Sequence, residues 1–156
     1  MQRTVRIATF GIALAILFLL GTLPSAQAQD HSCSNATLDG SFGFSGTGTV
    51  FNPSASLFAQ VGRQTFDGQG NTDGTATLTA NGNLRRVTWQ GTYVVNPDCT
   101  GSMTLFVSPL GATVNLDFVI DDDQAELRAI ATGPTGTGVP GNVETRVYRK
   151  QFRRQN

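Results

Sequence analysis

Apolar and polar residues alternate along much of the chain after residue 38, and no apolar pattern of helical period lasts longer than a turn or two. In residues 75–80, three threonines face one way while Ala76, Leu78 and Ala80 face the other, as in a half-buried strand. Together with the many glycines and threonines, this alternation indicates an all-β protein. We expect eight strands, at about 39–46, 57–66, 75–80, 85–95, 102–108, 113–120, 125–132 and 143–152.

The alternation assigns faces in the regular strands and leaves two strands open. Leu116 and Phe118 share a face, with Asp117 on the other. In 85–95, Trp89 and Tyr93 compete with Val87 for the interior, so the inner face is ambiguous. In 143–152, two valines alternate with Glu144 and Arg146, so either set could face the interior. We therefore make no assignment of the inner face there.

Short connections rich in turn-forming residues join the expected strands. They occupy 67–71, 81–83, 96–98 and 121–123, where glycine, asparagine, aspartate and proline favour tight turns. Parallel crossovers need a dozen or more residues, so consecutive strands should pair antiparallel. The pattern predicts an up-and-down barrel or a sandwich with meander topology.

The N-terminus has the pattern of a secretory signal peptide. Arg3 and Arg6 precede an apolar run at 7–20, and 26–28 reads Ala-Gln-Ala, a small-x-small cleavage site. We predict a signal peptide at 1–28 and one domain at 29–156 with a short basic C-terminal tail. The run is shorter than a membrane-spanning helix and no second one follows. The expected location is therefore secreted or periplasmic, without membrane insertion after cleavage.

The net charge limits which partners the protein can bind, and the cysteine content predicts a disulfide. Without Arg3 and Arg6, nine basic residues stand against 11 acidic ones, a formal charge near −2. Nucleic-acid binding requires a concentrated basic face, so no nucleic-acid partner is expected. Cys33 and Cys99 are the only cysteines, and an oxidising compartment favours their pairing in a disulfide.

Four motifs carry a family resemblance. They are Leu-Asp-Gly-Ser-Phe-Gly-Phe at 38–44, Thr-Phe-Asp-Gly-Gln-Gly-Asn at 65–71, Gly-Thr-Tyr-Val-Val-Asn-Pro-Asp-Cys-Thr-Gly at 91–101, and Leu-Asp-Phe-Val-Ile at 116–120. In this order they resemble small exported bacterial proteins of unknown function grouped with the allene oxide cyclase barrel-like domains. The resemblance implies an eight-stranded antiparallel barrel of lipocalin-like shape, and it runs from Cys33 to about Thr145.

Metal and cofactor chemistry find little support in the sequence. Asp67, Asn71 and Asp73 alternate like calcium ligands, but the bidentate glutamate and the helices of an EF-hand are missing, so a hairpin turn is favoured. One histidine, His31, and two paired cysteines cannot form a zinc site or a nucleophile-base system. We predict no metal and no cofactor.

The remaining hypothesis is a small apolar ligand inside the barrel. Its candidate lining is aromatic, with two carboxylates that would matter only if they faced inward: Phe42, Phe44, Phe58, Trp89, Tyr93, Phe106, Phe118, Asp117 and Glu126. Asp117 and Glu126 fit the solvent face better, and the aromatics could equally be packed core. The resemblance also raises a cyclase or isomerase, with Asp117, Glu126 or Tyr93 moving a proton. A third reading is a structural or interaction barrel with a filled core.

Overall fold

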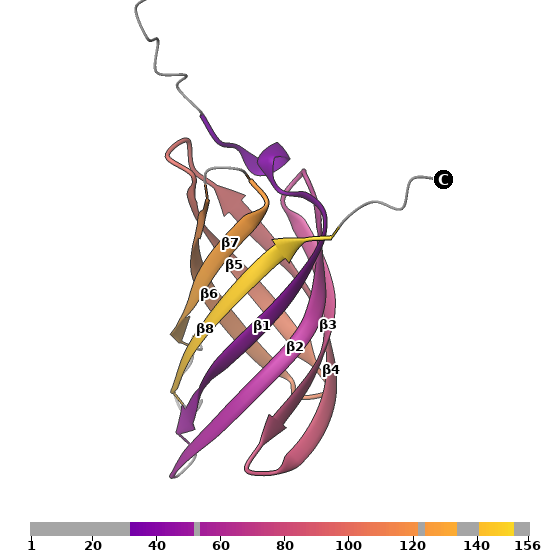
Figure 1. The fold of residues 1–156 in the computed structure, drawn as a ribbon, viewed down its shortest axis with the longest axis vertical. Coiled ribbons are helices and arrows are strands. Elements are labelled where there is room, and N and C mark those ends of the chain that lie inside the picture. Colours follow the sequence, from indigo (N-terminus) through magenta and orange to yellow (C-terminus); the bar gives the residue numbers. More distant parts are fainter. Residues whose placement is uncertain (1–31, 52–53, 122–123, 134–140, 152–156) are drawn as a thin grey trace, which may run out of the picture. The chain divides into compact units, whose positions relative to one another are not determined.

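Eight antiparallel strands follow one another around a closed barrel (Figure 1). The computed structural model describes residues 32–51, 54–121, 124–133 and 141–151. These residues belong to the second of two units, 31–156, and the predicted signal peptide lies outside them. The strands are β1 (Asp39–Phe51), β2 (Ala55–Asp67), β3 (Asn71–Ala80), β4 (Asn83–Val95), β5 (Thr100–Ser108), β6 (Ala112–Ile120), β7 (Glu126–Gly133) and β8 (Asn142–Lys150).

The predicted fold class is confirmed. Each strand pairs with its chain neighbours, and β1 closes the ring by pairing with β8, as in the register Ser45↔Val147. The alternation sets which side chains point inward: Ala76 on β3 and Leu116 and Phe118 on β6 are buried, as expected. A sandwich is thereby excluded, because the single sheet has no free edge among the described strands.

The sequence did not decide which face of β4 and of β8 points inward, and the structure gives a different answer for each strand. On β4, Val87, Trp89 and Tyr93 all face the interior and are buried. On β8, Glu144 and Arg146 face the interior, while Val143 and Val147 are 57% and 40% exposed. The polar residues of β8 thus lie inside and its valines outside, the reverse of the usual order.

Glycines in the wall make room for the rings of the core. Gly62 pairs directly with Phe44 and Gly74 with Trp89. A Cβ on Gly62 would lie 2.7 Å from the Phe44 ring, and one on Gly74 would overlap the Trp89 indole. The same arrangement recurs at Gly48 and Phe58. Each ring therefore occupies the space that a side chain on the paired neighbouring strand would need, so only glycine fits there.

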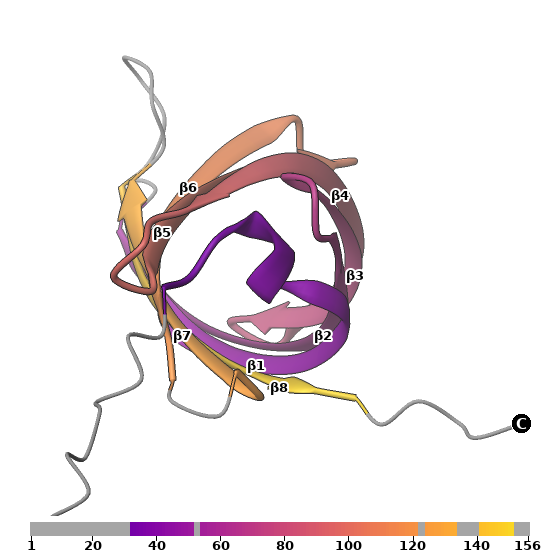
Figure 2. The same ribbon diagram turned by 90° about the horizontal axis from the view of Figure 1, so that it is seen from above.

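One end of the barrel is closed by the N-terminal segment. The short 3-10 helix η1 (Asn35–Thr37) lies within the ring of strands when the barrel is viewed end-on (Figure 2). Leu38 follows it and is fully buried, the Tyr93 hydroxyl donates to the Leu38 carbonyl at 2.9 Å, and the Asn35 side chain accepts from the Val95 amide at 2.8 Å. We call this the plugged end.

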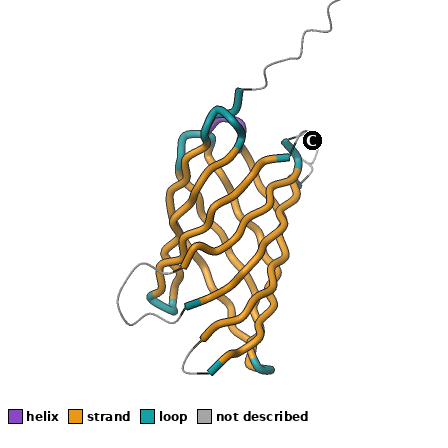
Figure 3. Tube along the Cα trace, turned by 90° about the vertical axis from the view of Figure 1, so that its left-hand side faces the viewer, coloured by secondary structure: helices purple, strands orange, loops and turns teal. Residues whose placement is uncertain are grey.

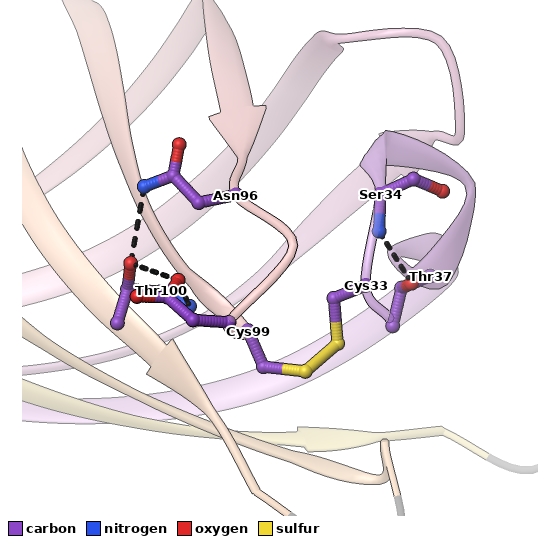
Figure 4. The surroundings of a disulfide bond; sticks show 7 residues. Cys33, Ser34, Thr37, Asn96, Cys99 and Thr100 are labelled. Atoms are coloured by element: carbon purple, nitrogen blue, oxygen red, sulfur yellow. Dashed lines mark hydrogen bonds between the residues drawn. A yellow bond between two sulfur atoms is a disulfide. The ribbon is translucent and has the colours of Figure 1, made fainter. Parts of the chain in front are cut away.

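The predicted disulfide between Cys33 and Cys99 is confirmed, and it links residues 33–38, which we call the plug, to the barrel (Figure 4). Cys99 lies in the turn between β4 and β5, where the Asp98 carboxylate accepts from the Thr100 amide at 3.1 Å. Cys33 also donates its amide to the Pro97 carbonyl at 3.1 Å. The plug is therefore fixed by a covalent bond and by hydrogen bonds to the end of β4.

The opposite end, which we call the open end, is where β1, β3, β5 and β7 end and β2, β4, β6 and β8 begin (Figure 3). Its described turn residues include 81–82 and 109–111, whereas 52–53 and 134–140 lie outside the described residues. No described segment crosses this end as η1 crosses the other. The two ends of the barrel are therefore built differently.

Replacing both cysteines by alanine should lower the free energy of unfolding by about 4 kcal/mol in the chain-entropy view, because the bond closes a long loop. The loop spans 66 residues. Urea unfolding of Cys33→Ala/Cys99→Ala measures the loss, and reduced wild-type protein should show a similar one. An unchanged midpoint in both samples would contradict the role given to the plug.

Gly74→Ala should lower the free energy of unfolding by about 1–3 kcal/mol, because the new methyl group displaces the Trp89 ring. Trp89 is the only tryptophan, so its emission should also shift. Gly141→Ala is the matched control, since nothing lies within 4 Å of its Cβ position. Equal effects of the two substitutions, by urea unfolding and fluorescence, would refute the ring-against-glycine packing.

Candidate functional site

A cavity of about 610 Å³ occupies the open half of the barrel. Its wall is largely apolar, and its mouth is edged by residues of the strand ends and turns. The lining residues are Val50, Ser56, Phe58, Gln60, Leu78, Ala80, Asn81, Asn83, Arg85, Val87, Trp89, Leu105, Val107, Leu110, Ala112, Thr113, Val114, Asn142, Glu144 and Arg146.

Aromatic rings pack the interior of the plugged half. Phe66 meets Phe42 and Tyr93 edge to face, with ring centroids 5.5 and 5.1 Å apart. Met103 and Leu127 complete this packing and are almost fully buried. The interior is thus divided into a packed core next to η1 and a cavity toward the open end.

A buried ion pair lies at the boundary between the packed core and the cavity. Glu144 and Arg146, two residues apart on β8, both face inward and are 2% and 5% exposed. The guanidinium binds both carboxylate oxygens, one through Nε and the other through Nη2 at 3.2 Å. Gln60 on β2 also donates its side-chain amide to the same carboxylate. The charge is therefore balanced inside the barrel.

Aromatic residues hold the Arg146 guanidinium in place. It lies 5.4 Å from the Phe44 ring centroid and 6.0 Å from that of Trp89. Its Nη1 donates to the Tyr148 hydroxyl at 3.3 Å. Stacking on rings and bidentate pairing suit the planar guanidinium, so lysine could not replace it here.

The Glu144–Arg146 pair, with the rings around it, forms what we call the floor of the cavity. It contains two opposite charges and has no net charge. Burial by itself would lower the pKa of Arg146, but the facing Tyr148 hydroxyl and Glu144 carboxylate outweigh it and raise that pKa above its ordinary value. Burial also raises the pKa of Tyr148, against the opposing effect of the adjacent Arg146 guanidinium. A molecule in the cavity would meet a compensated ion pair rather than a free charge.

The sequence-based candidates fall into three groups in the structure. Phe58 and Trp89 line the cavity, and Phe44 lies behind it against Arg146. Phe42, Tyr93 and Phe118 are buried but do not line it. Phe106 is 58% exposed, on the outer face of β5.

The two candidate carboxylates also lie away from the cavity. Asp117 is exposed on the outer face of β6, opposite Ser102 and Ile130. Glu126, at the plugged end, accepts hydrogen bonds from Arg128 at 2.9 Å and Arg149 at 3.1 Å. Tyr93 uses its hydroxyl on the plug. None of the three reaches the lining.

Several cavity residues were not among the sequence-based site candidates. They include Gln60, Arg85 and Asn142. Glu144 and Arg146 also line the cavity; the sequence offered them as a possible carboxylate and its partner, without deciding which face they occupy. The available signal was that Glu144 and Arg146 share a face with Tyr148, whose large ring belongs inside a small barrel. That signal competes with two valines on the opposite face, and alternation alone does not choose between them.

The turn that resembled a calcium loop is closed by its own hydrogen bonds. The Asp67 carboxylate accepts from the amides of Gln69 at 2.8 Å and Asn71 at 2.9 Å, and from the Asn71 side chain at 2.7 Å. These bonds, with that of the Asn71 side chain the strongest, lower the pKa of Asp67. Within the described ranges, no group of three or more histidine, cysteine or acidic residues is placed to hold a metal ion. No helix there is long and apolar enough to cross a membrane.

Comparison with solved structures identifies the same architecture in designed proteins. A redesigned β-barrel, mFAP1, solved bound to DFHBI, matches 74% of this chain and 97% of its own with a TM-score of 0.54 and 17% identity. The related mFAP0, also bound to DFHBI, matches 73% and 99% with a TM-score of 0.53 and 16% identity. At this identity the likeness shows the fold alone. No family model and no curated protein matches the chain.

Glu144→Leu should lower the free energy of unfolding by about 3–5 kcal/mol, because it leaves the Arg146 charge buried without its partner. Glu144→Leu/Arg146→Met should recover most of that loss, since an apolar pair of similar volume removes the uncompensated charge. Urea unfolding measures both variants.

The matched control is Glu126→Leu, which breaks ion pairs with arginines whose side chains are 63% and 80% exposed. This change should cost at most about 1 kcal/mol. If Glu144→Leu were as mild as Glu126→Leu, the ion pair would not be the organising contact of the floor.

Proposed function

We propose that the protein is an exported barrel that binds a small, largely apolar molecule in the cavity at its open end. The observation that carries this proposal is a cavity of about 610 Å³ in a barrel whose other end is plugged. Ligand sites of small molecules measure about 300–1,000 Å³ and are mostly apolar with a few placed polar groups. The volume and the lining both fit that class.

The lining favours a molecule with an apolar body. Four consecutive strands, β2 to β5, supply an aliphatic and aromatic wall through Phe58, Leu78, Val87, Leu105 and Val107. A ligand with an apolar body would cover these side chains and remove apolar surface from water, which favours binding. The polar groups are concentrated at the floor, in the ion pair, and at the mouth.

The structural neighbours support a ligand in a barrel of this shape. The designed barrels that share the fold are described as bound to DFHBI, a small molecule. Their low identity transfers no binding residue to this chain. They support the class of function, and the ligand of this protein must be found by experiment.

Export is part of the same proposal. The signal-peptide pattern at 1–28 lies outside the described residues, but the Cys33–Cys99 disulfide is of the kind that persists in oxidising compartments. A secreted or periplasmic location accounts for both. Membership of the allene oxide cyclase barrel-like group, on the motifs given above, is likewise a proposal.

The contacts of the carboxylate in the cavity favour a binding protein over a cyclase or isomerase. Among the described lining residues the one carboxylate is Glu144, and its oxygens are bound by Arg146 and Gln60. Both carboxylate oxygens are thus occupied by donors of the protein itself, and a proton-transfer catalyst needs a carboxylate oxygen within hydrogen-bond reach of the substrate. A barrel with a filled core is disfavoured by the cavity itself.

Titration with the neutral probe N-phenyl-1-naphthylamine tests the proposal, because this probe brightens in apolar sites and absorbs where tryptophan emits. We expect probe fluorescence to rise with a 1:1 stoichiometry and the emission of Trp89, at the cavity floor, to fall in parallel.

Ala80→Phe, which places a ring in the cavity, should weaken probe binding at least tenfold, since Ala80 lines the cavity. Thr79→Phe is the control, because Thr79 is the adjacent exposed residue on the outer face of β3. Binding that is absent in the wild type, or equally strong in both variants, would remove the cavity from the function.

A further inference from the structure

Exposed apolar side chains surround the mouth of the cavity. Leu57 and Val143 flank Thr49 on the outer face of β2, β1 and β8. The full set, which we call the rim residues, comprises Phe51, Leu57, Leu84, Leu110 and Val143, which are 48%, 75%, 62%, 45% and 57% exposed. They belong to the ends of four strands and to the β5–β6 turn. An apolar ring around an opening is unusual on a surface that meets only water.

Charge is distributed unequally between the two ends. Arg85 and Arg86 lie near the start of β4 at the open end, and neither has an acidic partner among the described residues. Apart from Glu144, the described acidic residues all lie in the half of the barrel next to the plug: Asp39, Asp67, Asp73, Asp98, Asp117, Asp121 and Glu126. The one acid in the open half, Glu144, is compensated by Arg146. Four described cations, Arg63, Arg128, Arg149 and Lys150, also lie in the plugged half, so seven acids against four bases leave it a formal charge of −3. The open half, with Arg85 and Arg86 and a neutral ion pair, carries +2.

We propose that the open end docks on an anionic lipid surface, so that the ligand passes between the bilayer and the cavity. This inference rests on the proposed function and names the source of the ligand. The rim residues enter the interfacial region while Arg85 and Arg86 meet the anionic headgroups, a combination typical of peripheral membrane contact. The negative plugged end is repelled, which orients the mouth toward the lipid.

Charge complementarity selects a lipid surface over a second copy of the chain. Two copies joined mouth to mouth would bring Arg85 and Arg86 of one against those of the other with no acidic side chain between them. Like charges in contact oppose such a pairing. An anionic bilayer instead satisfies both the charge and the apolar ring, and it contains molecules with the apolar body that the cavity fits.

Co-sedimentation of the mature protein with vesicles tests this docking. Vesicles of phosphatidylcholine with 30% phosphatidylglycerol should bind the protein more tightly than pure phosphatidylcholine, and 0.5 M NaCl should weaken the binding. Arg85→Gln/Arg86→Gln should reduce the partition coefficient about 25-fold, from about fivefold for each arginine at an anionic surface. Arg63→Gln/Arg149→Gln, which removes the same charge away from the mouth, should reduce it much less.

The apolar part has its own pair of variants. Leu57→Ser/Leu84→Ser should weaken vesicle binding about tenfold. Val94→Ser/Val119→Ser removes side chains that are 58% and 42% exposed near the plugged end and should leave vesicle binding unchanged. The naphthylamine titration in solution should be the same for both pairs, because none of these four residues lines the cavity.

The outcomes separate the two proposals. If the protein binds the probe in solution but does not bind vesicles, the docking proposal is wrong and the cavity function stands. The same conclusion follows if the valine pair and the leucine pair weaken vesicle binding equally. Vesicle binding without probe binding in solution supports the docking and removes the cavity function. If the leucine pair instead changes the mass measured by light scattering in the absence of vesicles, the rim contacts a second copy and the lipid proposal is wrong.

Discussion

The buried Arg146 guanidinium is the contact on which the interior depends. It is stacked against Phe44 and Trp89, bound to Glu144 on its own strand, and reached indirectly by Gln60 from β2. A charge at this depth requires a partner and fixed rings around it, since an uncompensated one would be very costly. The cluster therefore sets the level at which ring packing stops and the cavity begins.

The two ends of the barrel then acquire different roles. At the plugged end, η1, the disulfide and the Tyr93 hydrogen bond close the ring with rigid, short-range contacts. At the open end, the strands finish in turns and surround the cavity. A barrel with one fixed closure and one accessible mouth is suited to holding a ligand, because the floor does not have to move when the ligand enters.

Much of the fold follows from single-residue alternation, whereas the site does not. Short turns and the Thr75–Ala80 pattern lead to the correct strand order, and the oxidising context leads to the Cys33–Cys99 bond. The inward position of Glu144 and Arg146 could not be predicted in the same way. The two valines on the other face of β8 are more apolar, so the local sequence favours burying them instead. The inward position of the ion pair depends on rings from β1 and β4, which are distant in sequence. The glycine opposite each ring likewise becomes meaningful only once the register is known.

A crystal structure of the mature protein grown with N-phenyl-1-naphthylamine would show whether the open half of the barrel holds a ligand. We expect the probe inside the open half, in contact with Trp89 and above an intact Glu144–Arg146 pair. Side chains collapsed into that space, or the probe bound only on the outer wall of the barrel, would contradict this expectation.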